Sequence, residues 1–326
     1  MSVLLVEILR QLASNTIPPL PPRLPRPSFP LSQTGPVRMI QPIRTLPLTE
    51  VPLAEACAAL DAGYEGYVVP VRFDPPALVR RMLAEHIDLA ASHLILAPDG
   101  GTAGILLVAR RGRDARIAAV GIVPALRGAG LGAAAIALAI AEAEARGDAR
   151  LLLEVISSNA AAIATYRRAG FVDRRSLVGY AHDPVAPAEA ALPVEPAAPA
   201  GILPLLHAAW PGDPSWQTAP LSFVAATAPV TALRTPDGEA AALVDASGET
   251  ARLLALAVAP GARGRGLGRR FLEAVLAAHP GKSWAITATL PEDQAGGFLQ
   301  ATGWRRTPLS QIEMERPLTP RPATRR

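Results

Sequence analysis

The 326-residue sequence predicts an α/β protein of the α+β type with two tandem domains. First, a strand, a glycine-rich loop and a helix occur in the same order in both halves, which indicates duplication of a whole domain. Second, half of the residues are hydrophobic but only 4% are aromatic, so alanine and leucine must fill the cores. This composition favours helices packed on a sheet. Third, an alanine- and proline-rich stretch without apolar periodicity separates the halves.

Composition also places the expected domain boundaries. Residues 1–37 are a proline-rich N-terminal extension that cannot donate a regular hydrogen-bond ladder, so we expect them to be disordered. The first domain covers residues 38–183, and a semi-rigid linker covers 184–200. The second domain covers residues 201–318, and we expect the tail, 319–326, to be loose.

The first half begins with a hairpin, in which LILAP and GILLVARR flank the turn DGGTA. The strand RIAAVGIV follows, and the glycine loop leads into an alanine-rich helix over 131–146 that stops at Gly147. RLLLEVI is the next strand, and NAAAIATYRRAGF is a short helix that ends at Gly170. The second half repeats this order, with a helix over 267–278 and a weaker one ending at Gly303.

The two glycine loops are VPALRGAGLG at 123–132 and APGARGRGLG at 259–268. Each lies between a strand and a helix, where unpaired backbone N–H groups and the helix dipole favour an anion. Glycines let that backbone approach a bulky phosphate group. A dinucleotide site is the alternative, but PALR separates the strand from the first glycine, and Arg269 stands where a third small residue should pack.

A second motif follows the first loop only. R-x-x-G-x-G and then N-x-x-A-x-x-x-Y-x-x-x-G-F resemble the GNAT superfamily of acyl-CoA-dependent N-acyltransferases. The matching residues are Arg127, Gly130, Gly132, Asn159, Ala162, Tyr166, Gly170 and Phe171. The resemblance covers about 40–180 fully and 201–318 partly. It implies, for each domain, a mixed, mostly antiparallel twisted sheet flanked by helices, whose fourth and fifth strands splay apart.

By the same resemblance, acetyl-CoA is the co-substrate and lies in that cleft. The backbone of Ile122 and Val123 would pair with its pantetheine arm, with Asn159 and Ala162 on the other side. The cradle for the pyrophosphate comprises Arg127, Gly128, Ala129, Gly130, Leu131, Gly132 and Ala133. A weaker set in the second domain comprises Val258, Arg263, Gly264, Arg265, Gly266, Leu267 and Gly268.

The expected reaction transfers an acetyl group to a primary amine by direct attack. Tyr166 is the candidate general acid, because a phenol can protonate a departing thiolate; the alternative is a packing role. Glu154 is the candidate general base, as in the ribosomal-protein alanine acetyltransferases that L-E-V…S-N-A-A-A-I-A-x-Y resembles. The alternative is a strand-end glutamate paired with an arginine.

The acceptor pocket is expected at DAGYEGYVVPVRFDPP, residues 61–76, which hold two of the four tyrosines. Tyr64, Glu65 and Tyr67 are the candidate acceptor contacts, and helix-end packing is an equal alternative.

The second domain departs from the motif. Leu299 stands at the position of the motif tyrosine and Glu292 at the position of the motif asparagine. We therefore expect a second, non-catalytic copy.

The sequence disfavours a nucleic-acid-binding, a membrane-spanning and a metal-binding protein. The arginines are scattered rather than clustered, which argues against a nucleic-acid partner despite a net charge of +4. No apolar run reaches the length of a membrane span, no ligand spacing indicates a metal, and one cysteine suits a cytoplasmic protein.

The acceptor is expected to be a small-molecule amine, a protein N-terminus or a lysine. The protein is expected to be a monomer or a homodimer. An acyl-CoA-binding sensor or scaffold without turnover is the alternative function.

Overall fold

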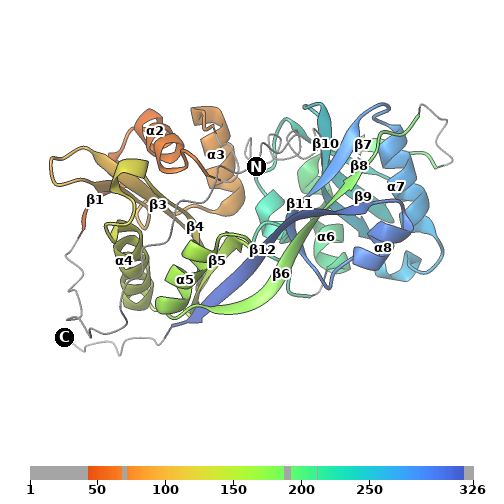
Figure 1. Ribbon diagram of the computed structural model, residues 1–326. Helices are drawn as coiled ribbons and strands as arrows, with labels where there is room; N and C mark the ends of the chain where they lie inside the picture. The colour runs from red at the N-terminus through yellow and green to blue at the C-terminus, as the bar shows by residue number, and fades with distance from the viewer. Residues whose placement is uncertain (1–42, 68–71, 187–191, 211, 319–326) are drawn as a thin grey trace, which may run out of the picture.

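The computed structural model describes residues 43–67, 72–186, 192–210 and 212–318, and its strands form one continuous sheet. The order across the sheet is β1-β2-β3-β4-β5-β12-β6-β11-β10-β9-β8-β7. Figure 1 shows the two halves of the chain at opposite ends of this sheet, with β6 and β12 crossing its centre. The predicted α/β class with a mostly antiparallel sheet is confirmed.

The first half builds one end of the sheet. Its strands are β1 (Arg44–Pro47), β2 (His93–Leu96), β3 (Thr102–Arg111), β4 (Asp114–Ile122) and β5 (Arg150–Ile156). Its helices are α2 (Leu53–Gly63), α3 (Pro75–Glu85), α4 (Leu131–Arg146) and α5 (Ala160–Arg168), with short 3-10 turns η1 (Leu48–Glu50) and η2 (Pro124–Leu126). Alternation along β3 divides the core, because Leu106 packs with α4 and α5 while Leu107 packs with α2 and α3.

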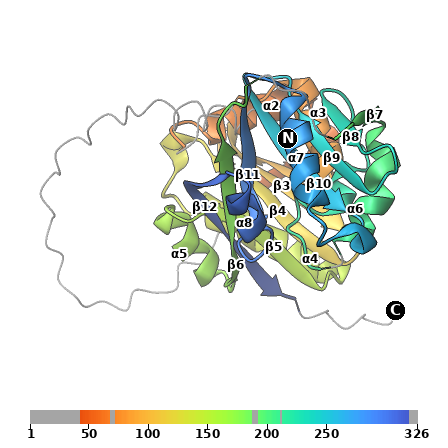
Figure 2. The same cartoon turned by 90° about the vertical axis from the view of Figure 1, so that its right-hand side faces the viewer.

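The second half repeats this plan in a shorter form. Its strands are β7 (Glu195–Ala197), β8 (Val230–Arg234), β9 (Ala240–Asp245), β10 (Thr250–Val258) and β11 (Ser283–Pro291). Its helices are α6 (Leu203–Ala209), α7 (Leu267–Ala277) and α8 (Gly296–Ala301), with 3-10 turns η3 (Pro199–Ile202), η4 (Pro220–Phe223) and η5 (Pro260–Ala262). Figure 2 shows α6 and α7 beside the strands of this half.

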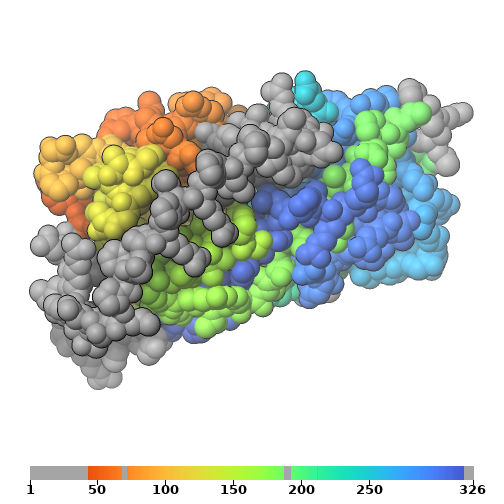
Figure 3. Space-filling model, viewed as in Figure 1, coloured from red at the N-terminus to blue at the C-terminus, as the bar shows by residue number. Residues whose placement is uncertain are grey.

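The two halves exchange one strand each. β6 (Val172–His182) belongs to the first half but pairs with β11 of the second, and β12 (Arg305–Pro317) belongs to the second half but pairs with β5 of the first. β6 and β12 also pair with each other. Figure 3 shows green and blue surfaces, from residues far apart in the chain, meeting along this seam. Each half therefore completes its sheet with a strand from the other.

In both halves the parallel pair of strands diverges. β4 and β5 pair only from Asp114 with Arg150 to Ile117 with Leu153. β10 and β11 pair only from Thr250 with Ser283 to Arg252 with Ala285. Beyond these points the strands separate, as the resemblance implied for the fourth and fifth strands.

The helix expected over 131–146 and the strand RLLLEVI have the predicted bounds, and Gly147 adopts the left-handed conformation that ends α4. Within the linker expected at 184–200, residues 195–197 form β7, because they pair with the free edge of β8. The expected extension at 1–37 and the tail at 319–326 lie outside the described residues. The division into two domains at these boundaries stays a prediction.

A buried ion cluster lies on the exchanged strands. The Glu313 side chain of β12 is 1% exposed, and its Oε2 accepts a hydrogen bond of 2.7 Å from Nε of Arg175 on β6. Arg174, also on β6, is a second partner of the same carboxylate. Asp213, from the second half, pairs with both arginines. The cluster therefore ties β6, β12 and the segment after α6 together.

A second contact between the halves involves Arg111 and Trp216. The guanidinium of Arg111, on β3, lies 4.4 Å from the centre of the Trp216 ring, a cation–π geometry. Its Nη1 donates a 2.7 Å hydrogen bond to the Trp216 carbonyl. The indole Nε1 of Trp216 donates in turn to the carbonyl of Glu85, at 2.8 Å. The second half thus contacts the end of α3 directly.

We predict that Glu313→Gln lowers the free energy of unfolding by about 3 kcal/mol, because two arginines then face a neutral amide. Glu315→Gln, on the same strand but more exposed, should cost less than about 1 kcal/mol. Urea unfolding followed by tryptophan fluorescence and by circular dichroism measures both. The four tryptophans all lie in the second half, so coincident transitions are expected only if the halves unfold together. Equal costs for the two variants would contradict the role of the cluster.

Candidate active site

Each glycine loop forms the same turn. Gly128 and Gly130 have φ of +79° and +89°, and Gly264 and Gly266 have φ of +76° and +75°. Nothing lies within 4 Å of a Cβ built at any of the four, so backbone conformation rather than crowding requires glycine here. Gly130 and Gly266 are the N-cap residues of α4 and α7, and neither helix has a side-chain cap. The N–H groups of both first turns are therefore available to an anion.

The loop arginines hold backbone carbonyls. Nε of Arg127 donates to the carbonyl of Ile122 at 2.8 Å, and its Nη2 donates to the carbonyls of Gly63 and Glu65 at 3.0 and 2.7 Å. Nε of Arg263 donates likewise to Val258 at 3.2 Å, and its Nη2 donates to Ala209. In each half the arginine fastens the loop to the end of the first α-helix of that half, α2 or α6.

A cavity of about 110 Å³ lies where β4 and β5 diverge. It brings together the candidate catalytic residues Glu154 and Tyr166 with the candidate acceptor residues Tyr64 and Tyr67. The remaining wall comes from β4, from the end of α2 and from the start of α5. The other lining residues are Gly63, Ile117, Ala118, Ala119, Val120, Val155, Asn159 and Ala162.

Glu154 belongs to a buried chain of charges. Nε of Arg116 donates to its Oε2 at 2.6 Å, and Nη1 of Arg116 donates to Glu85 at 2.8 Å. Nε of Arg81 donates to the other oxygen of Glu85 at 3.0 Å. Burial raises the pKa of Glu85, but Arg81 and Arg116 outweigh it and lower that pKa to about 2.

The second oxygen of Glu154 has no partner among the residues that the structure describes. The side chain is only 3% exposed, and its Oε1 is buried without accepting a hydrogen bond from any of them. Burial raises the pKa of this carboxyl, and the pairing with Arg116 offsets only part of that effect. The pairing with an arginine is therefore present, and the general-base role of Glu154 stays a prediction.

The tyrosines of the cavity are held in their neutral form. Burial raises the pKa of Tyr64 to about 12 and raises that of Tyr166 above its usual value. Burial also raises the pKa of Tyr67, and the Asn159 side chain acts in the opposite direction. The rings of Tyr64 and Tyr67 pack edge to face with centroids 5.1 Å apart. All three phenols can donate a proton or a hydrogen bond at neutral pH.

Other candidate residues take different places. Asn159 caps α5, because its Oδ1 accepts from the N–H of Ala162 at 3.2 Å. The N–H of Val123 donates to the carbonyl of Ala103 at 3.0 Å. Glu65 is exposed and does not line the cavity. Its carbonyl instead accepts from Arg127.

Sequence reasoning missed Arg116 and Glu85. A charged residue in the otherwise apolar run RIAAV was an available signal, since an arginine buried in a strand needs a carboxylate partner. Its partner Glu154 was already a candidate, but Glu85 lies far away in sequence at the end of α3. Only the packing of α3 against the sheet brings it there.

The second half lacks the chemical groups of this cavity. The pairing of β10 with β11 begins at Thr250 and Ser283, as that of β4 with β5 begins at Asp114 and Arg150. Counted from these residues, Thr287 occupies the position of Glu154. Leu299 is buried at the position of Tyr166, as the sequence alignment expected. Glu292, at the position of Asn159, pairs instead with Arg306.

The first half of the chain is similar to a known protein family. Residues 63–171, a third of the chain, match the family described as Acetyltransferase (GNAT) family. A search of curated protein sequences gave no match. The match includes the first glycine loop, Glu154 and Tyr166. Residues 63–171 are therefore similar to this family of acetyltransferases.

Solved structures share the fold over nearly the whole chain. A GCN5-related N-acetyltransferase from Sphaerobacter thermophilus aligns with a TM-score of 0.61 and 16% identity, over 86% of this chain and 97% of that one. A tandem GNAT protein from the clavulanic acid biosynthesis pathway aligns with a TM-score of 0.59 and 18% identity, over 86% and 99%. A GCN5-related N-acetyltransferase from Anabaena variabilis aligns with a TM-score of 0.53 and 15% identity, over 85% of this chain and 73% of that one. These similarities extend the fold to the second half.

Within the parts of the chain that the structure describes, no helix is long and apolar enough to cross a membrane. In the same residues, no group of three or more His, Cys, Asp or Glu side chains could hold a metal ion. His86 accepts a hydrogen bond from Arg111, and His93 lies 2.9 Å from Glu142.

We predict that Arg127→Ala loosens the end of α2, because three carbonyls lose their donor. Since these bonds are largely exposed, the cost should be about 1 kcal/mol, and amide hydrogen exchange over residues 62–67 should accelerate about five-fold. Arg263→Ala is the matched control and should leave that segment unchanged while affecting the end of α6. Unchanged exchange in Arg127→Ala would show that the arginine does not hold the helix.

Proposed function

We propose that the protein is an acetyl-CoA-dependent N-acetyltransferase that acts on a primary amine, with its chemistry in the first half. The observation that supports this most is the cavity between β4 and β5. Glu154 and Tyr166 both line it, and one carboxylate oxygen of Glu154 has no hydrogen-bond partner among the described residues. These are the two groups that a direct transfer requires, one to take a proton and one to give it.

The first glycine loop suits the donor. The uncapped start of α4 and the open space beside Gly128 and Gly130 fit a pyrophosphate, which needs several N–H donors and close backbone approach. Residues 127–133 would hold this part of acetyl-CoA, with Arg127 fixing the loop through carbonyls. When bound, acetyl-CoA supplies an activated acyl group on sulfur. Ile122 and Val123 lie between this loop and the cavity along the chain.

Glu154 and Tyr166 divide the proton transfers. Oε1 of Glu154 accepts a proton from the incoming amine, directly or through a water molecule, while Arg116 holds Oε2. The new C–N bond forms as the C–S bond breaks. Tyr166 then donates its proton to the departing sulfur, and burial keeps that phenol protonated until this point.

The acceptor pocket is proposed at the Tyr64 and Tyr67 side of the cavity. Their rings pack edge to face, and both tyrosines line the cavity together with Gly63 at the end of α2 and with Glu154. A cytoplasmic location and a monomeric or dimeric state remain part of this proposal.

We predict that Tyr166→Phe lowers kcat at least about 100-fold, because sulfur loses its proton donor. Release of free thiol against a panel of amines measures turnover, and calorimetry should show acetyl-CoA affinity within about two-fold of wild type. Tyr180→Phe is the control, since that tyrosine packs in the core of the second half. Full activity of Tyr166→Phe would exclude the acid role. Acetyl-CoA binding by wild type without thiol release from any amine would favour a binding protein without turnover.

A second prediction concerns pH. Because burial raises the pKa of Glu154, kcat/KM should rise with pH through an apparent pKa above the usual 4.5 of a glutamate. Glu154→Gln should lose this acidic limb and about 100-fold of the plateau rate. Tyr166→Phe should keep the limb at its reduced rate, which separates the two roles. An unchanged acidic limb in Glu154→Gln would assign that ionisation to another group.

A further inference from the structure

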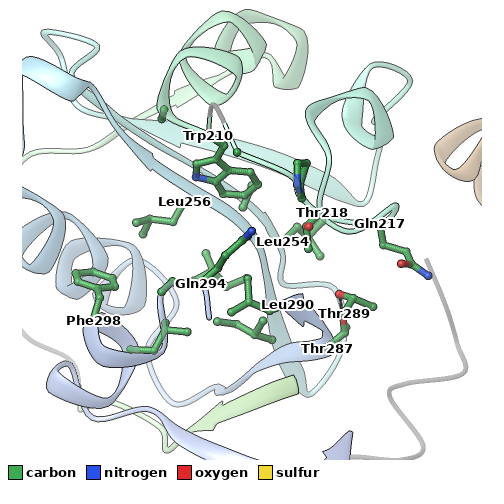
Figure 4. Close-up of a pocket in the computed structure, with 18 residues that line it drawn as sticks. Trp210, Gln217, Thr218, Leu254, Leu256, Thr287, Thr289, Leu290, Gln294 and Phe298 are labelled. Atoms are coloured by element: carbon green, nitrogen blue, oxygen red, sulfur yellow. Dashed lines mark hydrogen bonds between the residues drawn. The ribbon is translucent and has the colours of Figure 1, made fainter. Parts of the chain in front are cut away.

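The second half contains a larger cavity, of about 380 Å³, between β10 and β11. In Figure 4 the side chains of Trp210, Leu256, Leu290, Gln294 and Phe298 lie around a common space. Its floor is formed by both diverging strands and its sides by α8 and the segment after α6. The other lining residues are Ala209, Gly212, Pro214, Gln217, Thr218, Leu253, Leu254, Ala255, Ile286, Thr287, Thr289, Ala295 and Leu299.

This cavity corresponds to the candidate catalytic cavity through the repeat. Residues 253–256 of β10 take the places of 117–120 of β4, and both sets line their cavities. Thr287 replaces Glu154 and Leu299 replaces Tyr166. The substitutions remove the acid and the base, yet the space is more than three times as large. A half that served only as packing would be expected to fill such a space with side chains.

The lining of this cavity is neutral. None of the described residues that line it carries a charge. The hydroxyls of Thr287 and Thr289 bond to each other at 2.7 Å, and Nε2 of Gln294 donates to the carbonyl of Asp213 at 3.3 Å. Oε1 of Gln217 is buried and accepts no hydrogen bond from the residues that the structure describes. Because burying an unpaired charge is costly, the cavity favours an uncharged ligand with an apolar body.

Phe298 separates the cavity from the second glycine loop. Its ring atoms lie 3.5 and 3.7 Å from the Cβ position of Gly268, in the first turn of α7, and the same ring lines the cavity. The corresponding residue of the first half is Thr165, which is smaller and polar. An acyl-CoA molecule seated on the second loop would therefore meet an aromatic ring on its way into the cavity.

We propose that the cavity between β10 and β11 binds a neutral, largely apolar small molecule rather than acyl-CoA. Its volume lies in the range of small-molecule pockets, about 300–1,000 Å³. Apolar contacts with Leu254, Leu256 and Leu290 supply the affinity. The site is separate from the proposed catalytic cavity and does not depend on turnover there.

The test uses N-phenyl-1-naphthylamine, a neutral apolar probe whose fluorescence rises on burial. All four tryptophans lie in the second half, and Trp210 lines the cavity, so energy transfer from tryptophan to the probe reports binding there. Wild type should bind one probe per chain with a Kd of about 10 µM or tighter. A tenfold excess of acetyl-CoA should not displace it. The catalytic variant Tyr166→Phe should bind the probe equally well, which separates this proposal from the proposed function.

Cavity-filling variants identify the site. Thr287→Phe should weaken probe binding at least about ten-fold by occupying the space, and Leu254→Phe, on the other strand, provides a second filled variant if the first does not fold. Leu221→Phe is the matched control, because it adds the same ring at an exposed leucine outside the cavity. Absence of saturable binding to wild type, equal binding to filled and control variants, or stoichiometric displacement by acetyl-CoA would each overturn the proposal.

Discussion

The exchange of β6 and β12 is the constraint on which the rest of the structure depends. Each half lacks one strand of its own sheet and receives it from the other, so β5 pairs with β12 and β11 pairs with β6. Glu313, almost wholly buried, neutralises two arginines of β6 across this seam. Neither half can bury its sheet alone, and the cleft beside β5 is therefore built on a strand that comes from the second half. This gives the second half a structural role that is independent of any chemistry.

Because the chain is duplicated, its two halves can be compared directly. They share a backbone plan but differ in the side chains that line their cavities. The loop arginine, the left-handed glycines and the uncapped helix are the same in both halves. The cavities beneath them differ, because Glu154 and Tyr166 have become Thr287 and Leu299. The glycine loops of the two halves therefore share their backbone geometry, while the side chains that line the two cavities differ. The larger neutral cavity of the second half indicates that its cleft has been reshaped and not simply closed.

Much of the fold was accessible from the sequence because it rests on local signals. Glycine at 147 ends α4 where the alanine-rich helix was expected to stop, and periodicity gave β5 its bounds. Glu154 and Tyr166 were candidates because their motif has fixed spacing on a strand and the helix that follows it. The charge chain through Arg116 was not predicted. Its members come from α3, β4 and β5, and only their packing makes an arginine bridge two glutamates.

The sequence by itself determined most of the elements, the duplicated loops and the resemblance of residues 63–171 to a known family, since these depend on residue patterns between near neighbours in the chain. The tertiary structure decided which strands pair, since the pairing of β12 with β5 joins residues more than a hundred and fifty positions apart. It also decided that Arg127 holds carbonyls, that one oxygen of Glu154 is left unpaired, and that the cavity of the second half stays open. Such features depend on which surfaces are buried against each other. Contacts between segments that are distant in the chain do not produce a periodic pattern in the sequence.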